Sequence, residues 1–357
     1  MKVLFTISQL GGGGAERVVS VLANKFVSLG WLVEILMIYD KPIAYELDNR
    51  IKLISLHSKQ GRLFGTLKQI AAVRKYYKKT DADIIISFLV VVNMISVLAH
   101  FGSRIPLIVC ERNDPNRNPC SKIVRMVRDA VYRFSDGNVF QTPDAKRYFE
   151  NKNIKNGVVI PNPLKEHLPE PFLGERKKIF VTAVRLEKQK NIPLLIKAFA
   201  RVHESHPDYS LRIFGDGPDK DELIRLCAEH NISDSVKFEG FSKNWHSLIL
   251  DASCFVLPSD YEGLSNSLIE ALALGIPVIS TDHPIGGAKM FVENRKNGIL
   301  IPVGDENALV DAMMFIIDNP DSAWQYAKNA QSIRAKLAVD AIVRKWIEYV
   351  QTIKAAF

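Results

Sequence analysis

Apolar positions along the chain follow two alternating patterns. Short runs rich in Val, Ile, Leu and Phe predict buried strands, and longer segments with apolar residues three and four positions apart predict helices. In the first half, the predicted strands are 3–8, 31–39, 83–88, 107–110, 137–140 and 158–160, and the predicted helices are 15–29, 63–79, 93–101 and 121–134. Strands that alternate with helices are typical of a parallel sheet covered by helices on both faces.

This pattern breaks after residue 160 and then begins again. Proline recurs at positions 161, 163, 169 and 171, which predicts a hinge. The segment 178–184 repeats the character of 2–8, and further strands are expected at 211–214, 236–238, 254–257, 277–280 and 299–301. We therefore expect an α/β protein of two Rossmann-like doubly wound domains, residues 1–165 and 166–339, facing across a cleft. The last helix, 340–357, has an apolar stripe and is expected to pack on the first domain.

Composition indicates a folded protein, and the cysteine pattern indicates the cellular compartment in which it works. A chain of 357 residues with 47% hydrophobic and 24% charged residues excludes a disordered or collagen-like protein and suits two domains. The four cysteines form no C-x-x-C pair and no metal-ligand spacing, so we expect free thiols in a reducing cytoplasm.

Charge is distributed unevenly between the two halves. Residues 1–170 contain 25 Lys and Arg against 15 Asp and Glu, a balance of +10, whereas residues 171–357 contain 22 against 24, a balance of −2. The segment 52–80 holds eight Lys and Arg and no carboxylate. An anionic partner is therefore expected to approach the first half, and both nucleic acid and an anionic membrane surface fit this charge.

A run of four glycines, 11–14, separates the first predicted strand from the first helix. Without Cβ atoms, such a loop lets backbone N–H groups approach a phosphate at the positive end of a helix. The run fits neither G-x-G-x-x-G nor the P-loop pattern. Gly13 and Gly14 are therefore candidates for phosphate contact, and a tight structural turn is an equal alternative.

Two cations flank a predicted helix start in the second domain. Arg185 follows the strand, and Lys190 comes just before Pro193 opens the helix. The planar fork of Arg and the compact charge of Lys suit the oxygens of a leaving diphosphate. A solvated basic loop that also includes Lys188 is the structural alternative.

The stretch 259–271 combines two carboxylates with a loop and a helix start. Glu262 falls at the carboxyl edge of the strand 254–257, where open α/β sheets bind ligands, and Glu270 lies in the next helix. Carboxylates accept hydrogen bonds from sugar hydroxyls, and the loop amides of Gly263, Leu264, Ser265 and Asn266 can meet a phosphate. Alternatively, Ser267 and Glu270 form a capping box in which Glu270 only closes the helix.

At this point the chain resembles the retaining glycosyltransferases of family 4, which have the GT-B fold. The spacing of Glu262 and Glu270 matches their E-x7-E signature. Further matches cover nearly the whole chain: the glycine loop at 13–16, the segment before the hinge at 160–163, the R-x4-K diphosphate clamp at 185–190 and a second-domain turn at 214–218. The sequence also looks similar to the branch that extends polyprenyl-diphosphate-linked oligosaccharides with N-acetylgalactosamine.

The resemblance implies a role for each matched residue. Arg185 and Lys190 would neutralise the donor diphosphate, Glu262 would bind the transferred sugar and Glu270 the ribose, while Gly14 would close over the phosphates. None of the matched motifs contains a D-x-D metal site, so these cations and loop amides would stabilise departure of the diphosphate without a metal or other cofactor. Front-face attack by the acceptor hydroxyl, retention of configuration and domain closure are expected from the same resemblance.

The acceptor side departs from the family pattern. Family members commonly carry a His after the fourth strand, whereas this chain has Glu111 and Arg112 there. Arg112 is a candidate for an acceptor phosphate or sugar hydroxyl, or else for a salt bridge with Glu111 or Asp114. The family resemblance as a whole implies transfer of a hexose or N-acetylhexosamine, from a UDP-linked donor, to a lipid-linked glycan.

Two basic amphipathic segments suggest where the acceptor arrives. Between 63 and 79, Leu63, Leu67, Ile70, Val73 and Tyr77 form an apolar stripe with Arg62, Lys68, Arg74, Lys75 and Lys79 beside it; the segment 122–128 repeats the pattern. Together with the +10 half they indicate contact with anionic lipid and a peripheral place on the inner face of the cytoplasmic membrane. Ordinary helices packed on a sheet are the structural alternative.

Two other functions fit parts of the sequence. A nucleotide-sugar 2-epimerase uses the same two-domain architecture but needs no acceptor, and the pairing of R-x4-K with E-x7-E favours transfer. A basic nucleic-acid-binding protein fits the net charge of +8, but no recognised nucleic-acid motif or aromatic platform accompanies it.

Overall fold

The computed structural model describes residues 1–58, 63–172 and 174–357. The chain divides into two compact units, the first made of Met1–Pro163 with Val339–Phe357 and the second of Leu164–Ala338. Lys59 and Arg62, two of the eight basic residues of the segment 52–80, lie outside the described residues. Each unit is an open parallel sheet with helices against it, so the α/β, two-sheet GT-B architecture expected from the sequence is confirmed.

The first unit is built on seven parallel strands in the order β3-β2-β1-β4-β5-β6-β7. Their bounds are Lys2–Ile7 (β1), Leu32–Met37 (β2), Lys52–Ser55 (β3), Ile84–Phe88 (β4), Leu107–Cys110 (β5), Gly137–Phe140 (β6) and Gly157–Val159 (β7). The central strands β1, β4 and β5 are almost wholly buried. Burial on both faces explains why they read as continuous apolar runs in the sequence.

Helices follow most strands of the first unit. They are α1 (Gly14–Ser28), α2 (Leu63–Tyr77), α3 (Val90–His100), α4 (Lys122–Tyr132) and α5 (Pro143–Glu150). Local signals set the starts of the last two: Ser121 Oγ accepts from Val124 N at α4, and Thr142 Oγ1 accepts from Ala145 N at α5.

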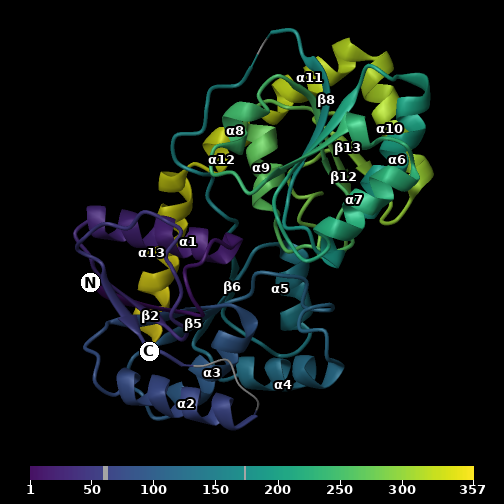
Figure 1. Ribbon diagram of the computed structural model, residues 1–357. Helices are drawn as coiled ribbons and strands as arrows, with labels where there is room; N and C mark the ends of the chain where they lie inside the picture. The colour runs from purple at the N-terminus through teal and green to yellow at the C-terminus, as the bar shows by residue number, and fades with distance from the viewer. Residues whose placement is uncertain (59–62, 173) are drawn as a thin grey trace. The chain divides into compact units, whose positions relative to one another are not determined.

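The C-terminal helix α13 (Val339–Ala356) returns to the first unit and packs beside α1 (Figure 1). Trp346 is fully buried, its ring centroid 6.0 Å from that of Phe88 on β4. The hydroxyl of Tyr349 accepts from Asn138 N at 2.6 Å, and Lys354 pairs with Asp83 at 2.6 Å. Contacts from three successive turns of α13 hold it across the sheet.

The second unit has six parallel strands in the order β10-β9-β8-β11-β12-β13. Their bounds are Lys177–Ala183 (β8), Ser210–Phe214 (β9), Val236–Gly240 (β10), Ala252–Leu257 (β11), Val278–Thr281 (β12) and Ile299–Ile301 (β13). The helices are α6 (Ile192–Ser205), α7 (Lys220–Glu229), α8 (Trp245–Leu248), α9 (Asn266–Ala273), α10 (Glu306–Asp318), α11 (Pro320–Ala330) and α12 (Ile333–Lys336), with short 3-10 turns at Lys188–Lys190 and Ser233–Ser235. Phe180, Phe199, Leu195 and Ile213 lie at the centre of its core.

Candidate functional site

The carboxyl edge of the second sheet brings together residues that are 72 positions apart in sequence. Lys190 follows β8 and Glu262 follows β11, its neighbour in the sheet, and Lys190 Nζ lies 2.5 Å from Glu262 Oε1. Ser259 Oγ donates to the same oxygen at 2.9 Å, and Gln189 Nε2 lies 3.3 Å from Oε2. The side chains of Lys190 and Glu262 are only 15% and 8% exposed, so in this structure the two largely screen each other from water.

Arg185 occupies a different environment from Lys190. Its side chain is 65% exposed, and its Nη1 lies 3.8 Å from Oε2 of Glu187. A charge pair this exposed contributes little to stability. Arg185 is therefore available to a ligand at the sheet edge at small energetic cost to the fold.

The loop between Glu262 and α9 is held by a helix cap. Ser265 is the N-cap residue, and its hydroxyl accepts from Leu268 N at 3.4 Å. Gly263, Leu264 and Ser265 precede α9, and Asn266 is its first residue, so all four candidate amides lie at the helix N-terminus. The partial positive charge of that terminus favours an anion there.

Glu270 does not close the helix start. Because Ser265 is the cap, Ser267 lies inside α9 and the capping box of Ser267 with Glu270 is wrong. Glu270 is 2% exposed, and its Oε2 lies 2.8 Å from Nε2 of His246 in α8. Sequence reasoning missed His246, since α8 is a single turn with no periodic pattern.

The loop after β12 packs directly on the Glu262 loop. A Cβ on Gly287 would lie 1.9 Å from the carbonyl oxygen of Gly263, so only glycine fits there. Ile285 has φ of 71°, a conformation that β-branched residues rarely adopt. Backbone held in such strain is common near ligand sites.

His283, on this same loop, is a second residue that the sequence did not single out. It is 1% exposed, burial lowers the pKa of its imidazole, and the charge of Glu262 opposes that shift. Its Nδ1 lies 3.2 Å from the carbonyl oxygen of Pro284. Each glutamate of the signature thus has a buried histidine nearby.

In the glycine loop of the first unit, the backbone groups of Gly13 form hydrogen bonds with side chains of the protein. Gly13 is the N-cap of α1, and its N–H donates to the carboxylate of Glu16. The Gly13 carbonyl accepts from the hydroxyl of Tyr45 at 2.8 Å. Gly14, the first residue of α1, is exposed. The structural turn and the exposed helix start are therefore both present at this loop.

Arg112 follows β5, and the residues around it come from the carboxyl ends of β4, β6 and β7. Its Nη1 donates to Asn162 Oδ1 at 3.0 Å, and Gln141 Nε2 donates to the same oxygen at 2.9 Å. The guanidinium carbon lies 4.6 Å from the ring centroid of Phe88. Within the described part of the chain, Nε and Nη2 of Arg112 are buried and have no hydrogen-bond partner. Burial accordingly lowers the pKa of Arg112.

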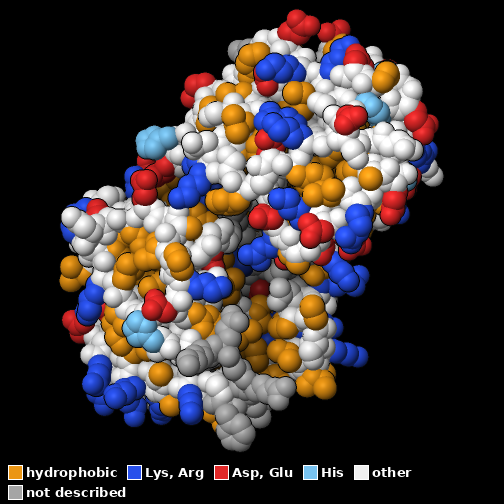
Figure 2. All heavy atoms as spheres, in the orientation of Figure 1, with side chains coloured by type: hydrophobic (Ala, Val, Ile, Leu, Met, Phe, Trp, Pro, Cys, Tyr) orange, Lys and Arg blue, Asp and Glu red, His pale blue; other side chains and the backbone are white. Residues whose placement is uncertain are grey.

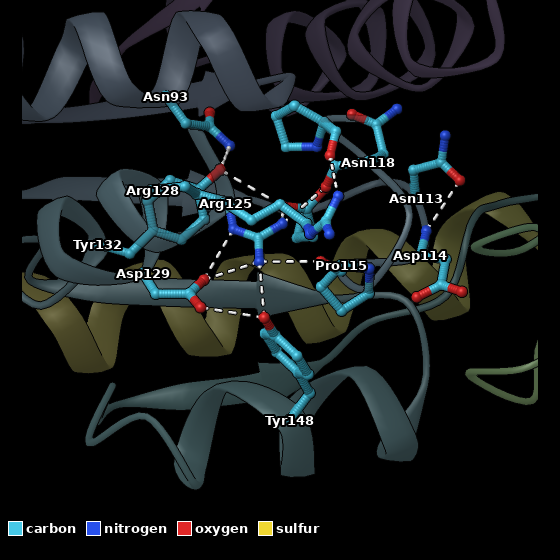
Figure 3. A network of polar contacts seen from close by, with 12 residues as sticks. Asn93, Asn113, Asp114, Pro115, Asn118, Arg125, Arg128, Asp129, Tyr132 and Tyr148 are labelled. Atoms are coloured by element: carbon cyan, nitrogen blue, oxygen red, sulfur yellow. Dashed lines mark hydrogen bonds and ion pairs between the residues drawn. The ribbon is translucent and has the colours of Figure 1, made fainter. Parts of the chain in front are cut away.

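Arg128 organises the loop that follows Arg112 (Figure 3). It is fully buried, and its Nε and Nη2 donate to Asp129 Oδ1 at 2.9 and 2.7 Å. Its remaining bonds tie down the loop and α5: Asn118 O at 2.7 Å, Pro115 O at 3.0 Å and the hydroxyl of Tyr148 at 3.1 Å. An arginine expected on a solvated face is instead the centre of a buried network.

Glu111 belongs to this network rather than to the surface. It is 2% exposed, and its Oε2 lies 4.0 Å from Arg128. Burial raises the pKa of Glu111 to about 7, against the opposing charge of Arg128. Its Oε1 accepts from the backbone N–H of Arg112 at 3.0 Å. Glu111 therefore fixes the backbone at Arg112.

The basic helices of the first unit differ from the sequence interpretation. On α2, Val73 and Tyr77 are buried as expected, but Leu67 is 60% exposed and Gln69 takes its place in the buried stripe. Lys68 and Lys75 are exposed and Arg74 is half-buried. Lys68 and Lys75 therefore point to solvent, as the amphipathic pattern required.

On α4 the two faces are reversed. Ile123, Met126 and Val127 are 73%, 63% and 46% exposed, whereas Arg128 is buried. Phe101 and Phe134 are also exposed and lie 5.4 Å apart, centroid to centroid. Figure 2 shows hydrophobic side chains at the surface over the region of α4, with Lys and Arg beside them. Over the described ranges, no helix is both long and apolar enough to cross a bilayer.

Comparison of the sequence with known protein families identifies the family of this chain. A model described as "Glycosyl transferase 4-like domain" matches residues 13–163, and one described as "Glycosyl transferases group 1" matches residues 164–333. The chain belongs to this glycosyltransferase family. The two matches meet at the boundary between the two compact units.

Two bacterial enzymes are similar in sequence to this glycosyltransferase along nearly its whole length. An α-1,4-N-acetyl-D-galactosaminyltransferase of Campylobacter jejuni, named for a PP-undecaprenol-linked glycan, is 28% identical over 100% of both chains. A second enzyme of that organism, named as an N,N'-diacetylbacillosaminyl-diphospho-undecaprenol 4-α-N-acetylgalactosaminyltransferase, is 29% identical over 92% of this chain and 93% of its own.

Solved structures share the fold of this glycosyltransferase. HepE of Anabaena, solved with UDP and glucose, superposes with a TM-score of 0.86 at 21% identity, covering 98% of this chain and 99% of its own. Sucrose-phosphate synthase of Thermosynechococcus elongatus superposes with a TM-score of 0.87 at 22% identity over the full length of both chains.

Proposed function

We propose that this glycosyltransferase moves an N-acetylhexosamine or hexose from a UDP-linked donor to a polyprenyl-diphosphate-linked oligosaccharide. The observation that carries the donor half is the pair of Lys190 and Glu262, one cation and one carboxylate side by side at the edge of the second sheet. A nucleotide sugar presents the complementary groups, an anionic diphosphate joined to a ring of hydroxyls. The names of the two Campylobacter relatives support the acceptor half.

Donor binding requires that the pair of Lys190 and Glu262 separate. The β-phosphate takes the ammonium of Lys190, and the sugar hydroxyls replace it on Glu262. Arg185 and the amides of Gly263 to Asn266 supply further positive potential, while Glu270 accepts from the ribose hydroxyls. Each lost protein contact is thus replaced by a ligand contact of the same kind.

The reaction exchanges one bond at the anomeric carbon for another. The bond from this carbon to the β-phosphate oxygen breaks, and the acceptor hydroxyl oxygen attacks from the same face, so the configuration is retained. The leaving phosphate takes the acceptor proton. Lys190, Arg185 and the loop amides stabilise the charge that develops on the diphosphate, a contribution typically worth about 10²–10³ in turnover for one donor.

Arg112 is the acceptor residue that we propose on the first unit. Its buried Nε and Nη2 lack partners in the described residues, and a desolvated guanidinium of this kind suits a phosphate or a sugar hydroxyl. Glu111 contributes by holding the Arg112 backbone. Lys68, Arg74 and Lys75 on α2 supply a positive field toward an anionic lipid acceptor.

We place the enzyme peripherally at the inner face of the cytoplasmic membrane. The exposed apolar side chains of α4, Ile123, Met126 and Val127, have basic neighbours in Lys122 and Arg125. Apolar groups beside cations suit the boundary between acyl chains and anionic headgroups.

A transfer assay separates the proposal from its alternatives. With UDP-N-acetylhexosamine and a polyprenyl-diphosphate glycan, the enzyme should release UDP only when the acceptor is present. Release or sugar isomerisation without acceptor would indicate the 2-epimerase. Tight RNA binding with no affinity for any nucleotide sugar would indicate the nucleic-acid-binding protein.

A further inference from the structure

A buried hydrogen bond joins two helices of the second unit at Glu270. His246 lies in the single turn α8, between β10 and β11, and Glu270 lies in α9, after β11. Nε2 of His246 is 2.8 Å from Oε2 of Glu270, and the two side chains are 6% and 3% exposed. A contact this well buried has little competition from water.

The chemistry of the two groups fixes the direction of this bond. A carboxylate only accepts hydrogen bonds, so the proton lies on Nε2 of His246 whether the ring is neutral or charged. The bond removes the freedom of the Glu270 carboxylate to rotate. Glu270 is thus oriented before any ligand arrives.

His246 is itself held in place by aromatic packing. Its ring centroid lies 4.1 Å from that of Trp245, and Trp245 lies 6.1 Å from Phe255 on β11. Phe255 is fully buried in the central strand of the sheet. Aromatic contacts therefore connect the ring that binds Glu270 to the buried strand β11.

We propose that His246 is a positioning residue for the nucleotide ribose: by binding Oε2, it presents the Glu270 carboxylate to the 2′ and 3′ hydroxyls. The inference rests on the proposed function, in which Glu270 binds the ribose. His246 touches Glu270 and not the nucleotide. Its effect on affinity therefore depends on two partners, the carboxylate and the ribose hydroxyls.

The test compares binding of UDP and 2′,3′-dideoxy-UDP by calorimetry. His246→Leu should weaken UDP binding by about tenfold, the scale of one hydrogen bond to a charged group, and leave dideoxy-UDP binding unchanged. His246→Gln should restore most of the UDP affinity, because its amide nitrogen reaches close to the Nε2 position. In a Glu270→Ala background, which removes the accepting carboxylate, His246→Leu should cost nothing further.

A control variant and a second substitution keep the outcome interpretable. His203→Leu removes another half-buried imidazole, one that bonds Ser235 at 2.9 Å, and should leave the binding of both nucleotides unchanged. If His246→Leu does not fold, His246→Asn gives the same comparison, since its shorter side chain cannot reach Oε2.

The outcomes separate this inference from the proposed function. Equal losses for UDP and dideoxy-UDP, or no loss for either, overturn the positioning role while leaving the UDP-linked donor intact. A wild-type enzyme that binds no UDP overturns the donor and this role together.

Discussion

At the scale of single residues, the site is built from charges that the fold has paired in advance. Lys190 and Glu262 come from neighbouring strand ends and bond each other in this structure. Because removing either leaves a largely buried partner charge, both substitutions affect the site beyond one lost ligand contact. For substitutions at Lys190 and Glu262, both the turnover and the folding of each variant should therefore be measured.

Lys190→Ala should lower turnover by about 10²–10³, because in the proposed mechanism it removes a preplaced cation that faces the leaving diphosphate. Glu262→Gln should also lower turnover by orders of magnitude with the fold intact. Lys188→Ala is the matched control, an exposed lysine two residues away that should retain full activity. Steady-state transfer rates, with circular dichroism as the check on folding, measure all three; full activity in both site variants would refute the assignment.

Glu111 gives the first unit a distinctive dependence on pH. Burial raises its pKa from 4.5 to about 7, so between these values the folded state binds a proton that the unfolded state has released. This contribution to stability is complete below the unfolded pKa and is lost as the pH rises through about 7. Unfolding free energy should therefore fall with pH over this window.

Glu111→Gln should flatten that fall, because a neutral amide keeps the acceptor oxygen without the proton. Urea unfolding at about pH 5 and about pH 8 measures the difference for wild type and variant. Glu150→Gln, which removes an exposed carboxyl of α5, should keep the wild-type profile. An unchanged slope in Glu111→Gln would show that Glu111 does not control it.

At the scale of elements, the hydrophobic pattern predicted every strand of the first sheet except β3. The strands β5 and β6 fall at the predicted residues, since both are fully buried; β5 is apolar throughout, and β6 has Asn138 as its one polar residue. The edge strand β3 was missed because its residues are half-exposed and include Lys52. The single turn α8 was missed for lack of a period, and His246 with it.

The amphipathic pattern of α4 was detectable, but its orientation was not. A period of three to four residues gives two faces without saying which is inside. Here Arg128 lies on the buried face of α4, where its nitrogens form hydrogen bonds with Asp129 and Tyr148. A stabilising polar network of this kind has no signature in a single sequence.

If α4 contacts lipid, replacing Ile123, Met126 and Val127 together with Ser should abolish sedimentation with anionic vesicles. These side chains are exposed, so the fold should tolerate the change. Replacing Lys68, Lys75 and Lys79 with Glu should also abolish it by reversing the charge of α2. Binding that persists in both variants would contradict the membrane proposal.

At the scale of the whole molecule, the chain crosses twice between its two units. The chain leaves the first unit after Pro163 and returns to it at Val339, so α13 completes the core of the first unit after the whole second unit has been traversed. The apolar stripe on 340–357 pointed to this packing, but the partners on β4 and β6 could come only from the structure.

Trp346→Ala should destabilise the first unit by about 3–5 kcal/mol, the usual cost of removing a buried aromatic ring. The ring stacks on Phe88 and is fully buried. Trp324→Ala is the control, since that side chain of α11 is 41% exposed. Thermal unfolding followed by calorimetry measures both, and equal small shifts would mean that α13 does not stabilise the unit.

The central claim is that a nucleotide sugar binds at the carboxyl edge of the second sheet by displacing the contact between Lys190 and Glu262. A crystal structure with bound UDP tests it most directly. The account predicts a diphosphate oxygen about 3 Å from Lys190 Nζ, the ribose on Glu270 and Lys190 separated from Glu262. UDP bound elsewhere, or bound with Lys190 still on Glu262, would contradict it.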